Sequence, residues 1–164
     1  MRKIILIFSA CLINVMSFAQ VDESYTIAKK VANEYVYSEA ILKAAVKIGL
    51  DAAANDVLSG GYEITNVDIR YSEEADVFYI QAHIETSSTI YTLGVELDED
   101  HNTGTLEMTG GGCTHSCGGS CGCTLEIITK CQTIKCGCGA GSTGCTGVIG
   151  MEFNAAFAVN ALSN

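Results

Sequence analysis

The chain contains no proline, few basic residues and, across one glycine-rich stretch, few large apolar side chains. Without proline, every helix and strand keeps an unbroken set of backbone donors. Nine Lys and Arg residues stand against nineteen Asp and Glu residues, which gives a formal charge of −10. This balance disfavours nucleic acid and anionic membrane surfaces as partners, and it suits cations or basic proteins better.

Catalytic motifs are also missing. The chain has no Gly-x-Ser-x-Gly, His-Glu-x-x-His or phosphate-loop pattern, each of which would place a reactive group in a defined local structure. His83 is predicted to lie in the middle of a strand and His101 in a turn, and neither is near a credible nucleophile in the sequence. The sequence therefore favours a protein that is not an enzyme.

Residues 1–19 have the pattern of an export signal. Arg2 and Lys3 form a positive start, and an apolar run that ends in small residues follows. We predict cleavage before Gln20, which removes two positive charges, takes the formal charge from −10 to −12 and leaves no membrane span in the mature chain. The predicted location is secreted or periplasmic. The alternative is a lipid anchor on Cys11, because the residues around it resemble a bacterial lipobox.

Residues 20–109 predict an α+β domain. Apolar residues recur at three- and four-residue steps from Ser24 to Leu58, which predicts two helices or one bent helix. The period then changes to two, which predicts four strands joined by short polar turns, over residues 64–71, 77–86, 89–97 and 103–109. We therefore expect an N-terminal helix, or two, packed on a four-stranded antiparallel meander. This order is similar to that of cystatin-like rolls, a topology shared by many unrelated functions.

Residues 110–147 form a Cys/Gly-rich module in which an ordinary hydrophobic core cannot be built. The segment holds eight of the nine cysteines, eleven glycines and only three charged residues. A unit below about 40 residues usually needs disulfides, a metal or a partner surface to keep one shape. Within it, residues 125–129 and 132–134 are rich in β-branched side chains and predict a small hairpin. Residues 148–164 are apolar, and we expect them to pack on the core as a last strand or helix.

Disulfides are the expected stabilisers of this module. Clustered cysteines in even number are normally paired in an oxidising compartment, and a bridge that closes a loop of about 15 residues contributes roughly 3 kcal/mol. Eight cysteines allow on the order of a hundred pairings, and the sequence selects none of them. A bridge within either Cys-Gly-Cys motif would be strained, so each member is expected to pair elsewhere. The predicted disulfide cysteines are Cys113, Cys117, Cys121, Cys123, Cys131, Cys136, Cys138 and Cys145.

A thiolate metal site is the first alternative. Zinc-binding cysteines are usually separated by about two to four residues, as in the pairs Cys113/Cys117 and Cys131/Cys136. The two Cys-x-Cys steps resemble metallothionein-like clusters in composition alone, and His115 is better explained as a turn residue than as a ligand. The main interpretation needs no cofactor, whereas this alternative needs Zn²⁺. Its ligands would come from Cys113, His115, Cys117, Cys121, Cys123, Cys131, Cys136, Cys138 and Cys145.

Two weaker alternatives remain. A strained Cys-Gly-Cys bridge would suit a thiol–disulfide redox protein, although no thioredoxin-like Cys-x-x-Cys motif or βαβ pattern accompanies it. The glycines at 110–112, followed by a Cys/Ser/Thr/Gly-rich tail, resemble the double-glycine junction of a modified-peptide precursor.

The sequence thus predicts an exported, non-catalytic binding or structural protein with a disulfide-stabilised module. Its expected parts are the signal peptide (1–19), the α+β domain (20–109), the Cys/Gly-rich module (110–147) and the apolar C-terminal element (148–164). The partner is expected to be another protein or a cell surface, and the sequence does not identify it.

Overall fold

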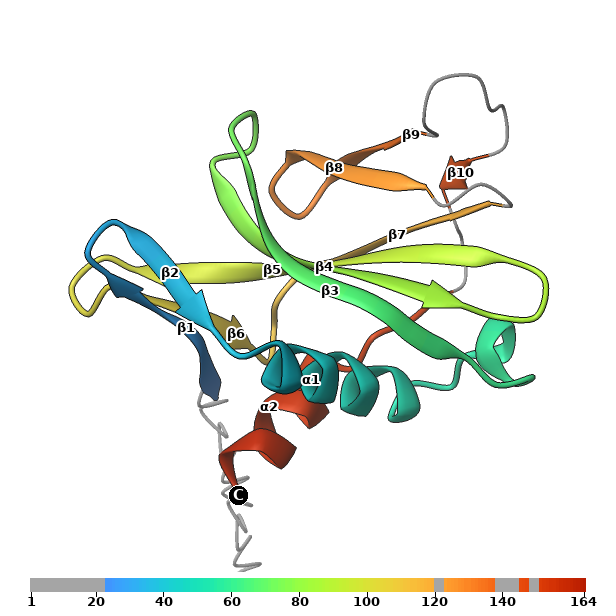
Figure 1. Cartoon of the computed structure of the whole chain (residues 1–164), viewed down its shortest axis with the longest axis horizontal. Coiled ribbons are helices and arrows are strands. Elements are labelled where there is room, and N and C mark those ends of the chain that lie inside the picture. Colours follow the sequence, from blue (N-terminus) through green and yellow to red (C-terminus); the bar gives the residue numbers. More distant parts are fainter. Residues whose placement is uncertain (1–22, 120–122, 138–144, 148–150) are drawn as a thin grey trace, which may run out of the picture.

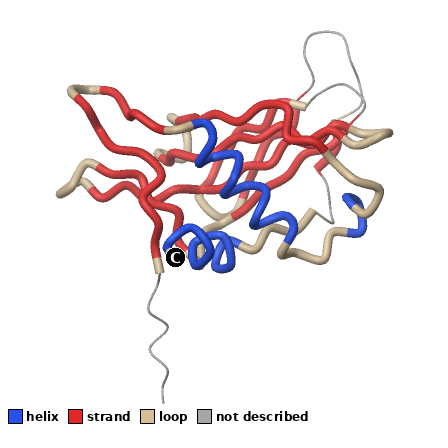
Figure 2. Tube along the Cα trace, turned by 60° about the horizontal axis from the view of Figure 1, so that its bottom comes forward, coloured by secondary structure: helices blue, strands red, loops and turns tan. Residues whose placement is uncertain are grey.

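The computed structural model of the chain describes residues 23–119, 123–137, 145–147 and 151–164. The predicted export signal and Cys11 lie outside these ranges. The described residues form three layers (Figure 1): a curled antiparallel sheet in the middle, two helices on one face and a two-stranded hairpin on the other. Figure 2 shows both helices on the same side of the strands.

The central sheet has eight strands in the described part of the chain. They are β1 (Ser24–Val31), β2 (Glu34–Tyr37), β3 (Glu63–Ser72), β4 (Val77–Glu85), β5 (Ile90–Asp100), β6 (Thr105–Thr109), β7 (Thr114–Gly119) and β10 (Thr146–Gly147). Strand β5 is the hub, because it pairs with β4 and β7 along most of its length and with β6 at its last three residues. Strand β6 then pairs with β1, and β1 with β2. This change of partner lets the β6-β1-β2 part curl away from the rest (Figure 1).

The helices cover one face of the sheet and enclose the larger apolar cluster. Helix α1 (Glu39–Asp51) buries a stripe with four-residue spacing, and helix α2 (Ala155–Ser163) packs beside it. A 3₁₀ turn, η1 (Asp56–Leu58), follows α1. The fully buried side chains of this cluster include Leu42, Val46, Ile80, Ile84, Leu93, Val95 and Val159.

Two local features dock α2 against α1. A Cβ built on Gly49 would lie 2.2 Å from Phe153 Cε2, so the ring can pack on α1 only where the helix has no side chain. Asn154 caps α2, since its side-chain oxygen accepts a hydrogen bond of 2.9 Å from the backbone N–H of Phe157.

The third layer is the hairpin of β8 (Thr124–Thr129) and β9 (Thr133–Gly137), on the opposite face of the sheet. It encloses a smaller apolar cluster that shares no residue with the first. Its buried members are Val77, Tyr79, Cys117, Cys123, Leu125 and Ile127. The hairpin predicted within the Cys/Gly-rich stretch is therefore present.

The predicted fold class is wrong. Residues 24–37, expected to be helical, form β1 and β2, and the expected meander strands are only four of the eight strands in the sheet. The chain is mostly β. It is not a helix packed on a four-stranded meander, and the similarity to cystatin-like rolls fails at the first element.

A β-bulge explains the error at the N-terminus. The pairing of β1 with β6 shifts between Thr26 and Ala28, which brings the consecutive residues Ile27 and Ala28 into the core. Two adjacent buried residues break the period of two and mimic helical spacing. The aromatic and β-branched residues of this stretch favour strands. Of the residues 39–58 that were expected to continue the helix, α1 covers Glu39–Asp51.

Candidate functional site

Among the residues that the structure describes, three disulfides fasten the hairpin to the sheet. They join Cys113 to Cys131, Cys117 to Cys136 and Cys123 to Cys145, with Cα–Cα separations of 5.2, 5.8 and 5.7 Å. These separations are usual for a disulfide, so the disulfide-stabilised module is confirmed for the described residues. Cys123 and Cys136, the members of the Cys-Gly-Cys motifs that the structure describes, each pair outside their own motif, as expected. Cys121 and Cys138 lie outside the described ranges.

The bridges are spread over the whole hairpin. Cys131 lies in the β8–β9 turn, Cys136 lies on β9 and Cys123 directly precedes β8. Of their partners, Cys113 directly precedes β7, Cys117 lies on β7 and Cys145 directly precedes β10. The hairpin is therefore attached to the sheet at its turn, on one strand and at its base.

Hydroxyl groups of the sheet complete the attachment. Ser72 on β3, Tyr79 on β4 and Thr92 on β5 donate hydrogen bonds to successive alternate carbonyls of the hairpin, at Ile127, Leu125 and Cys123. The bond from the Tyr79 hydroxyl to the Leu125 carbonyl is 3.2 Å long. Buried carbonyls need donors, and these hydroxyls supply them. We name this set the hydroxyl clasp. It was not predicted from the sequence, because hydroxyl residues within strands carry no distinctive pattern.

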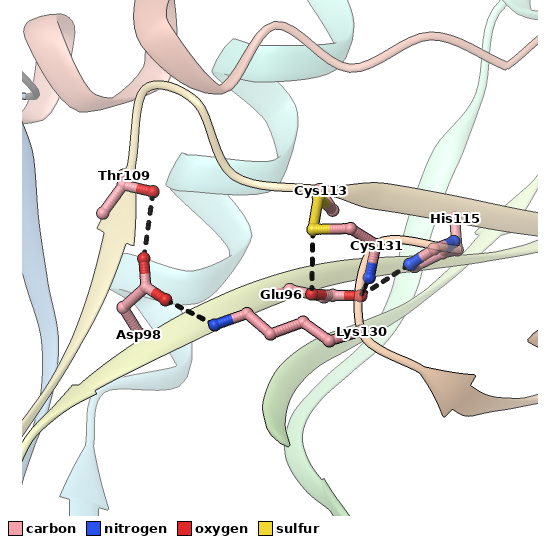
Figure 3. Close-up of a disulfide and its surroundings, with 7 residues drawn as sticks. All are labelled: Glu96, Asp98, Thr109, Cys113, His115, Lys130 and Cys131. Carbon is pink, nitrogen blue, oxygen red and sulfur yellow. Dashed lines mark hydrogen bonds and ion pairs between the residues drawn. A yellow bond between two sulfur atoms is a disulfide. The ribbon is translucent and has the colours of Figure 1, made fainter. Parts of the chain in front are cut away.

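A buried acid lies beside the first bridge (Figure 3). Glu96 on β5 is 3% exposed, and its Oε1 accepts hydrogen bonds from His115 Nε2 at 2.7 Å and from the Cys131 backbone N–H at 2.8 Å. A carboxylate only accepts, so Nε2 of His115 carries a proton. The structure places His115 on β7, so its interpretation as a turn residue is wrong. Glu96 was not predicted as a site residue. The sequence marks it only as an acid between the apolar residues Val95 and Leu97.

A neutral histidine lies further along the same face. The Thr92 hydroxyl gives its proton to the Cys123 carbonyl, so at 3.3 Å from His83 it can only accept, and His83 Nδ1 is the donor. The Gln81 amide donates to the other ring nitrogen, Nε2, at 3.2 Å. Burial, assisted by the positive charge of Arg70, lowers the pKa of His83 below its ordinary value. Its environment therefore selects the neutral ring.

A groove of about 670 Å³ separates β8 from β3 and β4. Arg70 in this groove pairs with Asp68 at 3.1 Å, and Glu126 lies 3.8 Å from Lys135. Glu73 and Glu74 are exposed in the β3–β4 turn, and no described lysine, arginine or histidine lies within 4 Å of their carboxylates. The polar lining includes Arg70, Glu73, Glu74, Gln81, Thr124 and Glu126. This groove therefore carries excess negative charge.

The structure brings together some of the cysteines that the metal alternative requires. Cys113, Cys117, Cys123, Cys131, Cys136 and Cys145 are disulfide-bonded, so they would offer thiolates only after reduction. In the described residues, one group of three potential ligands has its ligand atoms within 4.8 Å of one another: Glu96, Cys113 and Cys131.

Comparison with known proteins supplies no relative from which a function could be transferred. No family model, no curated protein and no solved structure matches this chain. Across the ranges that the structure describes, neither helix has the apolar length required to cross a membrane.

Proposed function

We propose that this chain is an exported, non-catalytic binding protein whose groove between β8 and the β3–β4 strands receives a basic segment of a partner protein. The observation that carries the proposal is the unbalanced charge in the groove: Glu73 and Glu74 have no cationic partner among the described residues, and the lining arginine, Arg70, is already paired with Asp68. A mature chain of formal charge −12, after loss of the predicted signal from the −10 of the whole, attracts a basic partner at long range.

The attachment of the hairpin supports this role. One wall of the groove is β8, which the disulfides and the hydroxyl clasp hold against the sheet. A wall fixed before binding loses little conformational entropy when a ligand arrives, and this saving favours affinity. Cross-linked hairpins also resist local opening, which suits a protein that works among extracellular proteases.

The test uses the purified oxidised chain and a fluorescent, lysine-rich decapeptide, with binding followed by fluorescence anisotropy. The groove variant is Glu73→Gln with Glu74→Gln. The matched control is Glu34→Gln with Glu85→Gln, which removes the same charge from two exposed positions outside the groove. Loss of two exposed charge contacts is expected to weaken binding by about tenfold, whereas the control should change it little.

Equal weakening by both double variants would show attraction to the net charge alone and would contradict a groove site. Absence of measurable binding by the unsubstituted chain at low salt would contradict a basic ligand altogether.

A further inference from the structure

The two carboxylate oxygens of Glu96 have different surroundings: one accepts two hydrogen bonds, and the other faces the Cys113–Cys131 disulfide. Oε1 receives the two hydrogen bonds from His115 and the Cys131 backbone. Oε2 lies 3.6 Å from Cys131 Sγ. A disulfide sulfur has no proton to donate, so this contact is not a hydrogen bond. Among the described residues, no proton donor therefore reaches Oε2, although the side chain is 97% buried (3% exposed).

A buried carboxylate oxygen without a donor requires an explanation, because buried polar groups normally have partners. The protein has placed this oxygen toward the two sulfurs of one bridge, and three ligand atoms, one from each of Glu96, Cys113 and Cys131, lie within 4.8 Å of one another. Figure 3 shows the side chains converging from β5, the start of β7 and the hairpin turn. Thiolate sulfur and carboxylate oxygen are both common ligands of zinc.

We propose that Cys113, Cys131 and Glu96 form a Zn²⁺ site when the bridge between the two cysteines is reduced. Zinc lies about 2.3 Å from thiolate sulfur and about 2.0–2.2 Å from carboxylate oxygen, so tetrahedral ligands lie roughly 3.5–3.8 Å apart. Oε2 is already at that distance from Cys131 Sγ. The two sulfurs have to separate for zinc to bind, and Cys131 lies in an exposed turn. Three protein ligands leave a fourth position for water.

The step is a two-electron reduction followed by metal binding. A dithiol reductant transfers two electrons and two protons to the bridge, becomes a disulfide itself and leaves two thiols on the chain. Zn²⁺ then replaces the two thiol protons, which pass to solvent. His115 is a positioning residue in this site: its Nε2–H holds Oε1, which keeps Oε2 directed at the metal.

The site is specific to one bridge. Cys131 is exposed to a reductant. In each of the other two described bridges one cysteine is fully buried (Cys117, Cys123) and its partner (Cys136, Cys145) is only partly exposed. The Cys113–Cys131 bridge is therefore expected to open first. This order lets the zinc site form while the remaining described bridges keep the hairpin in place.

The first measurement identifies the bridge that opens. The oxidised chain is treated with a limiting amount of a water-soluble phosphine, which reduces disulfides and binds zinc weakly, and is then alkylated. Peptide mass mapping should find label on Cys113 and Cys131. If another described bridge opens first, or if Cys113 and Cys131 stay unlabelled, the proposal is wrong.

The second measurement tests the metal. Zn²⁺ added before alkylation should slow labelling of Cys113 and Cys131 by about tenfold or more, because the metal holds both thiolates. Co²⁺ in place of Zn²⁺ should give the absorption of a tetrahedral site with two thiolate ligands. Failure of zinc to protect either cysteine would overturn the proposal.

The third measurement assigns Glu96. Glu96→Gln keeps the size of the side chain and an acceptor for His115, and it should lower zinc affinity by at least the ~10–100-fold that outer ligand partners contribute. Asp98→Asn is the matched control, since Asp98 lies two residues along β5 and pairs instead with Lys130 at 2.9 Å. Unchanged zinc affinity in Glu96→Gln, or an equal loss in Asp98→Asn, would contradict the site.

His115→Asn provides a second variant that leaves all three ligands present. It should lower zinc affinity by about 10–100-fold while the Co²⁺ spectrum keeps its two-thiolate signature. A merely structural role for His115 would destabilise the oxidised chain without changing the metal affinity of the folded fraction.

Discussion

Gly94 lies directly beneath Leu125: a Cβ built on Gly94 would be 2.9 Å from Leu125 Cδ2. Gly94 is on β5 and Leu125 is on β8, so this contact sets how closely the hairpin approaches the sheet. Leu125 is 3% exposed and belongs to the smaller apolar cluster. A strand interior normally disfavours glycine, and close approach of a neighbour is the reason to retain it.

Gly94→Val should therefore push the hairpin away from the sheet. We expect a loss of about 1–3 kcal/mol in the free energy of unfolding, as for overpacked cores, measured by urea denaturation of the oxidised chain. In a Leu125→Ala background the cost of Gly94→Val should be smaller, since the clashing methyl groups are gone. Gly111→Ala is the control, because nothing lies within 4 Å of the position a Cβ would occupy there. An equal cost of Gly94→Val in both backgrounds would contradict the contact.

The hydroxyl clasp predicts a second stability change. Tyr79→Phe removes the donor to the Leu125 carbonyl and leaves a buried acceptor unsatisfied, at a cost of about 1–3 kcal/mol. Amide exchange in β8 and β9 should accelerate with it. Tyr25→Phe is a suitable control, because the Tyr25 hydroxyl makes no hydrogen bond with any described residue. If amide exchange in the hairpin of Tyr79→Phe is as slow as in the unsubstituted chain, the Tyr79 bond of the clasp does not stabilise the hairpin.

The two separate apolar clusters predict separable stability of the layers. Replacing Cys117 and Cys136 together by alanine opens a loop with a sequence separation of 19 residues. We expect a loss of about 2–5 kcal/mol, with fast amide exchange in the hairpin. The backbone amides of α1 should stay protected from exchange, because the larger apolar cluster to which α1 belongs shares no residue with the smaller cluster under the hairpin. Simultaneous loss of protection in α1 and the hairpin would show one cooperative unit instead.

His83 predicts a loss of stability in acid. Its pKa is lowered in the folded chain, chiefly by burial and also by Arg70, so the unfolded chain binds a proton more readily. The free energy of unfolding should therefore be unaffected by this group well above a pH of about 6.5. As the pH falls below about 6.5 it should decrease, by up to roughly 1.4 kcal/mol per pH unit, until the folded chain also binds the proton.

The measurement is urea denaturation at a series of pH values. His83→Asn keeps a donor and an acceptor but does not titrate, so its stability should depend less on pH between about 6.5 and 5. His101→Asn is the control, because that side chain is 82% exposed in a turn. Identical pH profiles for His83→Asn and the unsubstituted chain would rule out His83 as the source.

Local patterns predicted the elements whose pairing partners lie nearby in sequence. The strands expected over residues 64–109 occur as β3 to β6 with shifted ends, because short turns join them and side chains alternate. Strand β1 was mistaken for helix because it pairs with β6, some eighty residues away (Ser24 with Thr109), across a bulge. Strand β2 was missed with it, although its pairing with β1 is local. Long-range pairing leaves no mark in the local period.

The same limit applies to the site. Cysteine content predicted disulfides, but the pairing of Cys117 with Cys136 depends on β9 lying over β7, which the sequence does not reveal. Glu96 was missed because it becomes notable only when the fold brings Cys113, Cys131 and His115 around it. The single sequence signal was an acid placed between the apolar residues Val95 and Leu97, since a charged residue is rarely buried unless it is paired.

The interior is divided between the larger apolar cluster under the helices and the smaller cluster that contains Cys117 and Cys123, and this division predicts an order of assembly. The helix-side layer forms from apolar contacts alone and needs no oxidant, whereas the hairpin can be locked down only after electrons have been removed from its thiols. Strand β5 lies between the two parts: Leu93 and Val95 belong to the larger cluster, and Gly94 contacts Leu125 of the hairpin. The part expected to fold first therefore presents the surface on which the hairpin is later oxidised. A chain made under reducing conditions would thus have a folded helix-covered face of the sheet and a hairpin that is not yet cross-linked to the other face.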